Sequence, residues 1–334
     1  FTNPAGLVTQ ALREAGFERT IGICDGANAG QGAYAHWAGV EPEQVRAEVF
    51  GLNHLSWCRR AWLDGEDLLP RAIADDRFLR DEQGLFEPAL VRQVGMHLNE
   101  YLYYYYYAEQ ALAFIRGESM TRGEEIVELN QRLIEQLEET GIEHNPEHAL
   151  RVFFGYEKRR GATYMHFPRG DSGAGYRADS GAHGGMSIAD ADRDRIFDAD
   201  IPAEAGEGYA GVALSIIEAL EKDQPLFTAL NVPNEGAIDG MAADDVVEVS
   251  CRVDGSGVHV LPVGEIPLPQ LGLMRAVKLY ERLTVQAIRE RSRRLAVEAL
   301  MAHPLVLSYS RAKPLVDEFL LAHRAYVGDW PVSG

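Results

Sequence analysis

Apolar and polar residues follow two different patterns in the first part of the chain. The segment PAGLVTQALREAG (4–16) has proline near its first turn and glycine at its end, which predicts a helix. The short apolar run TIGIC (20–24) is typical of a strand, and residues 44–67 predict further strands around the turn-forming LDGED. This lead-in of a helix followed by strands favours an α/β fold.

The rest of the chain continues both patterns. A helical pattern extends from Pro88 to about Glu139, and residues 121–141 carry a strong 3.6-residue apolar rhythm that Gly141 closes. The further predictions are a helix over 209–223, strands over 227–234, 245–255 and 257–264, and closing helices from Gln270 to His303 and from Ser310 to Val327. The stretch from about 165 to 208 is rich in glycine, aspartate and serine, and predicts a long surface insertion that is either functional or disordered.

Composition and charge narrow the class of protein. The chain has 334 residues, 46% of them hydrophobic and 25% charged, as in ordinary globular proteins. No apolar run approaches the roughly 18 residues that a membrane span needs. A formal net charge of -19 argues against binding to nucleic acid or to an acidic membrane, because both would repel it. A small anionic substrate stays possible, since a pocket needs only a few local cations.

The cysteines are odd in number and far apart in the sequence: Cys24, Cys58 and Cys251. This spacing is unlike a disulfide framework and indicates a reducing compartment, which favours the cytoplasm.

The glycine-rich stretch TIGICDGANAGQGAYAHW (20–37) is the first candidate for chemistry. A dinucleotide-binding loop needs the spacing G-x-G-x-x-G, but Asn28 stands at the second required position, so the fingerprint fails. What the stretch does present is Cys24 followed by Asp25 at the end of a predicted strand, where open α/β sheets place their ligands.

A second candidate is the segment FGLNHLSW (50–57), which places His54 beside Asn53 near another strand end. A thiolate and an imidazole together suit a borderline divalent metal, and two protein ligands leave positions open for substrate or water. The alternative is a buried cysteine and a core histidine without a ligand role. Spacing alone favours this alternative, because nothing local ties Cys24 to His54.

The run EYLYYYYYAEQ contains Tyr101 and Tyr103 to Tyr107 on at least two helix faces. Most of these rings are expected to pack in a core or interface. One of them can be a general base if a nearby metal or cation lowers its pKa from about 10. Arg122 begins the next helix and is either an anion ligand or a solvated charge.

Nine ordered blocks carry a family resemblance. They are FTNPAGLVTQAL, GICD, FGLNHLSW, EYLYYYY, TRGEE, NVPNEGAI, VEVSCRVDGSGVHVLPVG, LGLMRAVKLYERLTVQA and ALMAHPLV. Together they resemble glycoside hydrolase family 4, and within it the 6-phospho-β-glucosidases. The resemblance implies an α/β chain: residues 1–55 are the remainder of a Rossmann-like NAD-binding domain, and 56–334 form an α+β C-terminal domain of the lactate/malate dehydrogenase type, with the insertion at about 165–208. The NAD-binding loop itself is expected upstream of Phe1.

The family's chemistry differs from that of ordinary two-carboxylate glycosidases. In it, NAD oxidises the sugar at carbon 3, a base removes the proton from carbon 2, the leaving group departs from carbon 1, and water adds before the ketone is reduced again. A divalent metal, commonly manganese, polarises the sugar oxygens. The resemblance implies these residue roles: Cys24 and His54 bind the metal, Tyr101 is the catalytic base, Asp25 is a candidate general acid, and Asn3, Asn53 and Arg122 contact the substrate.

The chain departs from the family pattern at two places. Tyr103 stands where the family commonly has an arginine, and Gly26-Ala27 replace a Val/Met-Pro pair. Asp25 is typical of members that act on α-glucosides, which leaves the anomeric preference open. The alternatives are therefore a 6-phospho-α-glucosidase, an α-galactosidase or uronidase of the same family, or a non-catalytic truncated remnant. The expected substrate is a small phosphorylated disaccharide or glycoside, and the expected assembly is a homodimer or homotetramer.

Overall fold

The computed structural model describes residues 1–165, 197–201 and 208–331. The insertion predicted at about 165–208 therefore lies almost wholly outside the described residues. None of the described helices is long and apolar enough to cross a bilayer.

Within the described residues, seven strands form one sheet in which every pair of neighbours is antiparallel. The main order is β3-β2-β1-β6-β5, while β4 pairs with β2 and β7 with β6. The strands are β1 (Arg46–Leu52), β2 (Leu55–Leu63), β3 (Glu66–Asp67), β4 (His97–Leu98), β5 (Leu226–Pro233), β6 (Val246–Asp254) and β7 (Gly257–Val260). Strands β1 and β2 are joined by a tight turn at Asn53 and His54, where His54 has a φ of 64°.

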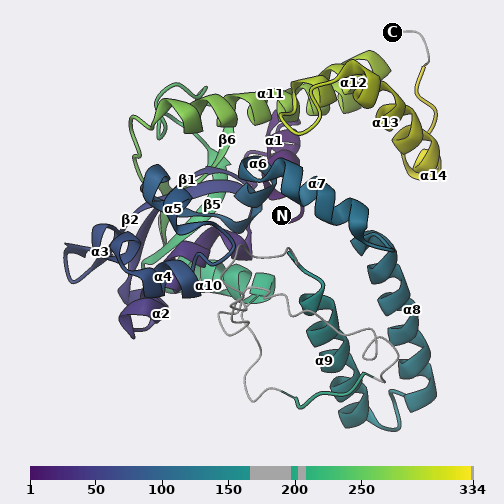
Figure 1. Ribbon diagram of the computed structural model, residues 1–334, viewed down its shortest axis with the longest axis horizontal. Helices are drawn as coiled ribbons and strands as arrows, with labels where there is room; N and C mark the ends of the chain where they lie inside the picture. Colours follow the sequence, from purple (N-terminus) through teal and green to yellow (C-terminus); the bar gives the residue numbers. More distant parts are fainter. Residues whose placement is uncertain (166–196, 202–207, 332–334) are drawn as a thin grey trace.

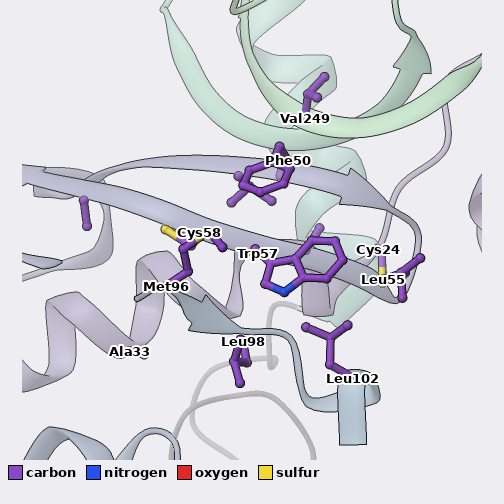
Figure 2. Packing of buried hydrophobic residues seen from close by; sticks show 14 of the residues in the cluster. Cys24, Ala33, Phe50, Leu55, Trp57, Cys58, Met96, Leu98, Leu102 and Val249 are labelled. Carbon is purple, nitrogen blue, oxygen red and sulfur yellow. The ribbon is translucent and has the colours of Figure 1, made fainter. Parts of the chain in front are cut away.

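The core lies against β1, β2 and β6. Large side chains from the first two strands pack there, and the rings of Phe50 and Trp57 stack with centroids 5.6 Å apart. Figure 2 shows Leu98 and Leu102 beneath the Trp57 ring and Val249 of β6 above Phe50. Strand β6 is buried at nearly every position because it is paired on both sides and covered by helices.

Helices cover both sides of the sheet (Figure 1). One side carries α1 (Ala5–Glu14) and α11 (Leu268–Glu290), and the other carries α2 (Ala29–Ala38) and α10 (Gly208–Lys222). Short helices before and between the strands are η1 (Asp25–Asn28), η2 (Pro42–Gln44), α3 (Leu69–Ala74), α4 (Asp76–Asp81), α5 (Pro88–Val94), η3 (Glu100–Leu102) and α6 (Tyr103–Tyr106). We call the seven strands with α1, α2, α10 and α11 the sheet body; its layers confirm the predicted α/β class.

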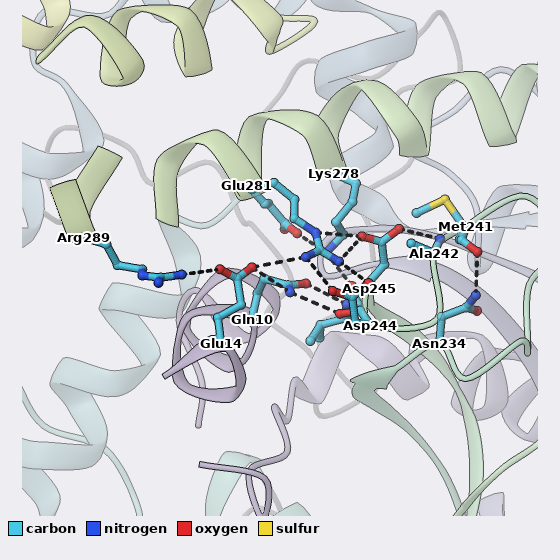
Figure 3. Close-up of polar contacts among 12 residues, drawn as sticks. Gln10, Glu14, Asn234, Met241, Ala242, Asp244, Asp245, Lys278, Glu281 and Arg289 are labelled. Carbon is cyan, nitrogen blue, oxygen red and sulfur yellow. Dashed lines mark hydrogen bonds and ion pairs between the residues drawn. The ribbon is translucent and has the colours of Figure 1, made fainter. Parts of the chain in front are cut away.

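Polar side chains hold α1 and α11 together. Arg282 of α11 binds the carboxylate of Asp245, with Nη2 to Oδ1 2.7 Å, and also contacts Glu14 of α1 at 3.3 Å. Arg289, two turns further along α11, reaches the same Glu14 at 3.4 Å (Figure 3). These contacts fix the first helix, and with it the start of the chain, against the longest helix of the fold.

Three helices extend away from the sheet body on one side (Figure 1). They are α7 (Ala108–Gly117), α8 (Arg122–Thr140) and α9 (Pro146–Ala162), and we call residues 108–165 the helical arm. Helix α8 begins at a capping box of Thr121 and Glu124 and ends at Gly141 with a φ of 68°, which confirms the helix and the stop predicted there.

Three of the predictions along the chain are wrong. The run TIGIC does not form a strand, because Gly22 alone makes an isolated bridge, to Asn231 of β5. The single helix predicted from Gln270 to His303 is two helices: Arg291 takes a left-handed φ of 49°, and Ser292 caps α12 (Arg293–Ala302). The last predicted helix is likewise divided into α13 (Tyr309–Ala322) and α14 (Arg324–Val327).

The predicted domain boundary at residue 55 passes between β1 and β2, which are the two arms of one hairpin. That division, and the Rossmann-like origin of residues 1–55, stay predictions.

Candidate active site

The predicted site residues gather where the start of the chain, the β1–β2 turn and η3 meet. Cys24 is buried and stands at the N-cap of η1, directly before Asp25. The expected position at the end of a strand is therefore wrong, because residues 20–24 pair with the sheet through Gly22 alone. The Asp25 carboxylate accepts a hydrogen bond from the Gly26 amide at 2.9 Å, which fixes it in the first turn of η1.

The β1–β2 turn supplies the second group. His54 stacks its ring on that of Tyr101, with centroids 3.8 Å apart and planes 9° from parallel. The neighbouring Asn53 accepts a hydrogen bond from the Ala5 amide through Oδ1 at 3.1 Å, and this bond ties the turn to the first residue of α1. The imidazole and the tyrosine that the resemblance assigns to metal binding and catalysis thus form one unit.

Burial controls the protonation of this site. It raises the pKa of the Cys24 thiol far above its ordinary value, and the negative charges of Glu248 and Asp25 add to that effect. Burial also lowers the pKa of His54 to about 4, although Asp25 opposes this. At neutral pH the pair is therefore a neutral imidazole and a protonated thiol. A cation that binds both must displace the thiol proton, so its affinity should rise with pH.

A buried carboxyl group lies beneath Asn53. Glu248 of β6 is fully buried, and its Oε2 accepts hydrogen bonds from Asn231 at 3.0 Å and from Asn53 at 3.4 Å. Desolvation raises the pKa of this carboxyl group. The sequence analysis did not single out Glu248, although a glutamate within an apolar strand pattern is a recognisable signal, because buried acids need hydrogen-bond partners.

Tyr101 is held at its hydroxyl as well as at its ring. Its oxygen is in hydrogen-bond contact with the hydroxyl of Tyr164, and the Tyr164 hydroxyl also contacts Oε1 of Glu100 at 3.0 Å. Burial raises the pKa of Tyr101 well above the ordinary value for tyrosine. Neither Tyr164 nor Glu100 was expected at the site, and no local motif marks them.

Arg122 reaches this group indirectly. Its Nε donates to Oγ1 of Thr163 at 3.2 Å, and its guanidinium carbon lies 5.4 Å from the centroid of the Tyr164 ring. The structure therefore places Arg122, the first residue of α8, next to Tyr164.

Asn3 lies on the other side of the site, where the hydroxyl of Tyr209 donates to its Oδ1 at 3.4 Å. Burial raises the pKa of the Tyr209 hydroxyl, and the negative charge of Asp25 adds to that effect. Tyr209, at the start of α10, is a further site residue that the sequence analysis missed.

The remaining tyrosines confirm the expected packing. Tyr103 is buried and stacks on Tyr107 with centroids 5.0 Å apart, while Tyr104 to Tyr107 pack partly buried against the main core. Tyr103, which stands where the family commonly has arginine, is thus a core residue.

Cys24 and His54 have no third partner of the usual kind. Across the described parts of the chain, no group of three or more His, Cys, Asp or Glu side chains is arranged to hold a metal ion. A thiol, a neutral imidazole and the adjacent amide of Asn53 still form a donor set that suits a borderline divalent ion, with positions left for a ligand's oxygens.

A comparison with known proteins identifies the class to which this fold and site belong. The sequence model of the family 4 glycosyl hydrolase C-terminal domain matches residues 49–306. The chain belongs to that family, which confirms the resemblance seen in the sequence.

Individual relatives are similar over nearly all of the chain. The 6-phospho-beta-glucosidase BglT of Thermotoga maritima is 27% identical over 98% of this chain and 66% of its own length. The phospho-alpha-glucosidase PagL of Clostridium acetobutylicum is 26% identical, over 98% of this chain and 66% of its own length. The chain thus spans just under two thirds of the length of these relatives.

Solved structures agree with the fold. The 6-phospho-beta glucosidase from Thermotoga maritima with manganese, NAD+ and glucose-6-phosphate superimposes with a TM-score of 0.71 at 26% identity, covering 98% of this chain and 65% of that one.

Proposed function

We propose that the protein is a glycosidase that hydrolyses 6-phospho-β-glucosides by NAD-assisted oxidation at carbon 3, elimination and addition of water. The stacking of Tyr101 on His54 carries this proposal, because it places a candidate base directly against a candidate metal ligand. Family membership and the similarity to 6-phospho-β-glucosidases support it.

The cation that we propose at Cys24 and His54 is manganese, which is present in the similar Thermotoga structure. When bound, it supplies a Lewis acid for the sugar oxygens and a positive charge that favours the phenolate of Tyr101. The protein's part is to keep the imidazole neutral and the thiol desolvated, as the pKa directions of these two groups indicate.

The side chains have distinct proposed roles. The Tyr101 oxygen takes the proton from carbon 2, and Asp25 protonates the leaving group. Asn3 and Asn53 bind sugar hydroxyls, and Arg122 binds the sugar phosphate. NAD, which accepts and returns the hydride at carbon 3, is the second proposed cofactor. The glycines of the 26–32 loop lack the dinucleotide spacing, so no residue of that loop is assigned to it.

A 6-phospho-α-glucosidase is the second candidate. Asp25 favours it, as does the 26% identity to a phospho-alpha-glucosidase. We propose that either enzyme acts in the cytoplasm as a homodimer or homotetramer.

Turnover of nitrophenyl 6-phospho-β-glucoside and of its α anomer, each with and without NAD and manganese, tests the proposal. Hydrolysis of the β anomer that requires both cofactors is the expected result. Faster hydrolysis of the α anomer selects the second candidate, and no hydrolysis of either sugar overturns both.

The metal site has a test that does not need activity. We expect Cys24→Ser to lower the manganese retained after gel filtration at least tenfold, as the loss of a direct ligand should. Cys251→Ser is the matched control, because Cys251 is a buried thiol of β6 whose Sγ donates to the Val249 carbonyl. Equal manganese content in the two variants would rule out Cys24 as a ligand.

A further inference from the structure

The hydroxyl of Tyr101 ends a short polar chain that begins in the helical arm. Tyr164 follows α9, and its hydroxyl contacts both the Tyr101 hydroxyl and the carboxylate of Glu100. The Tyr101 and Tyr164 rings meet edge to face, with centroids 5.8 Å apart and planes at 79°. Two residues that lie 63 positions apart in the sequence are thus in direct contact at the candidate base.

The hydrogen-bonding capacity of a phenol limits the arrangements of this chain. A tyrosine hydroxyl has one proton to donate, while an ionised carboxylate and a phenolate can only accept. The Tyr164 hydroxyl contacts both Glu100 and Tyr101 as a donor, and it donates to the Tyr101 oxygen when Tyr101 is a phenolate. In that form one lone pair of the Tyr101 oxygen is engaged by Tyr164, which turns the remaining ones away from Tyr164.

The ring of Tyr101 is held separately. His54 stacks on it at 3.8 Å, and Tyr104 lies near it with ring centroids 6.5 Å apart. Its backbone amide donates to Oδ1 of Asn99 at 3.0 Å, and Asn99 in turn donates to Oγ of Ser56 in β2 at 3.2 Å. The ring and the backbone of Tyr101 are therefore fixed by other residues. Tyr164 and Glu100 restrict what remains, which is the rotation of the Tyr101 hydroxyl about its C–O bond.

Tyr164 is itself positioned by the start of α8 and by the end of α9. Arg122 at the start of α8 lies over its ring and binds Thr163, and the Thr163 hydroxyl donates to the Arg160 carbonyl at 2.8 Å. These contacts hold the start of α8 and the end of α9 together beside the candidate site.

We propose that Tyr164 and Glu100 are positioning residues for Tyr101, and that they orient its oxygen toward the substrate carbon from which a proton is removed. The inference rests on the proposed function for the role of Tyr101 as the base. A base must lie within hydrogen-bond reach of the proton it takes, and small displacements of a reacting group can cost about a hundredfold in rate. Positioning of this kind affects the rate of proton removal more than substrate affinity.

The first test reads the Tyr101 hydroxyl without any turnover. 3-Fluorotyrosine placed at position 101 of the full chain gives a ¹⁹F resonance that depends on hydrogen bonding at the adjacent hydroxyl. We expect Tyr164→Phe and Glu100→Ala to shift or broaden that resonance. Glu100→Gln keeps an acceptor oxygen for Tyr164, and should therefore restore most of the wild-type signal.

Tyr156→Phe is the matched control. Tyr156 also lies on α9, and its hydroxyl also donates to a side chain, Oδ1 of Asn130 at 2.6 Å, but the contact is within the helical arm. We expect this variant to leave the resonance of position 101 in place. A Tyr164→Phe spectrum that matches the wild type would overturn the proposal.

The second test uses the reaction. In Tyr164→Phe we expect kcat to fall about ten- to a hundredfold with KM within about twofold, because orientation is lost while the sugar contacts stay. We also expect a larger isotope effect with substrate deuterated at carbon 2. An equal loss of activity without a larger isotope effect indicates general damage and contradicts positioning.

The two tests separate the two proposals. If the wild type hydrolyses no phosphoglycoside, the proposed function fails, and the fluorine spectra still decide whether Tyr164 and Glu100 orient Tyr101.

Discussion

The sheet body and the helical arm are built in opposite ways. The sheet body shares one continuous core, in which Phe50, Trp57 and Phe78 are almost completely buried. The arm has a separate cluster in which Leu129, Val152 and Tyr156 are buried together with Phe197 of the segment 197–201. Most of the candidate site belongs to the sheet body and to the segments that pack on it, whereas the arm contributes through Arg122 at the start of α8 and Tyr164 after α9. Groups that need exact placement thus lie on the part with the largest core.

This difference predicts two levels of stability within one chain. Segments with few buried apolar contacts open locally at a lower free energy than the main core. The arm should therefore exchange its amide protons faster than β1 and β6 do, while the site keeps its shape. Substitutions in the two regions test whether the arm is less stable than the sheet body.

The largest expected effect is that of Trp57→Ala. Removing a fully buried ring leaves a cavity and should lower the free energy of unfolding by about 3–5 kcal/mol. Leu129→Ala removes an equally buried side chain of the arm, and should speed amide exchange in α8 and α9 while changing global unfolding much less. Guanidinium titration with hydrogen-exchange mass spectrometry measures both. Equal global losses would show that arm and body unfold as one unit.

The next effect is a loss of stability in acid that arises in the sheet body. Burial lowers the pKa of His97 from 6.5 to about 4. Between these values the unfolded state binds the proton and the folded state does not, so stability is complete above pH 6.5 and falls as the pH drops toward 4. The full contribution is about 3 kcal/mol, since one pKa unit corresponds to about 1.4 kcal/mol.

We therefore expect His97→Leu to flatten the dependence of unfolding free energy on pH between 6.5 and 4, as measured by urea titration at a series of pH values. His54 contributes to the same range, so some slope should remain. Replacement of the exposed His323 by Gln is the control. A variant curve parallel to that of the wild type would contradict the origin assigned to this slope.

The smallest effect compares two helix caps. Thr121 caps α8 in the arm, and Ser292 caps α12, which packs on α11. Each change to alanine should cost about 1 kcal/mol locally. We expect Ser292→Ala to lower the global unfolding midpoint, and Thr121→Ala to act mainly on amide exchange in the first turns of α8. Identical responses in both measurements would remove the distinction between the regions.

The sequence predicts those parts of the fold that are set by local chemistry. The helix over 122–140 is bounded by a capping box and a glycine, and the β1–β2 hairpin and strands β5 to β7 follow from apolar spacing and turn residues. The TIGIC run fails as a strand because its apolar character reflects burial next to β5 and not a ladder of hydrogen bonds. The break at Arg291 falls within a run of helix-forming residues, and Ser292 is the signal that marks it.

The site residues also divide into those that local sequence indicates and those that it does not. Cys24, His54 and Tyr101 stand in recognisable motifs, and the family resemblance points to them. Tyr164 and Tyr209 contact the site from 63 and 206 positions away from their partners, so no local pattern can indicate them. Such contacts exist only after the chain has folded.

The pairing of β1 with β6 has a consequence for how the chain is made. The Val49 amide donates to Oγ of Ser250, 201 positions later, and Phe50 lies opposite Val249. During synthesis the β1–β2 hairpin leaves the ribosome long before β6, the second neighbour of β1, has been made. Exposed strand edges pair readily with other chains. The residues made between β2 and β6 include the whole helical arm. Until β6 is made, the edge of β1 stays unpaired and Asn53 lacks its contact with Glu248, so the site is completed late in synthesis.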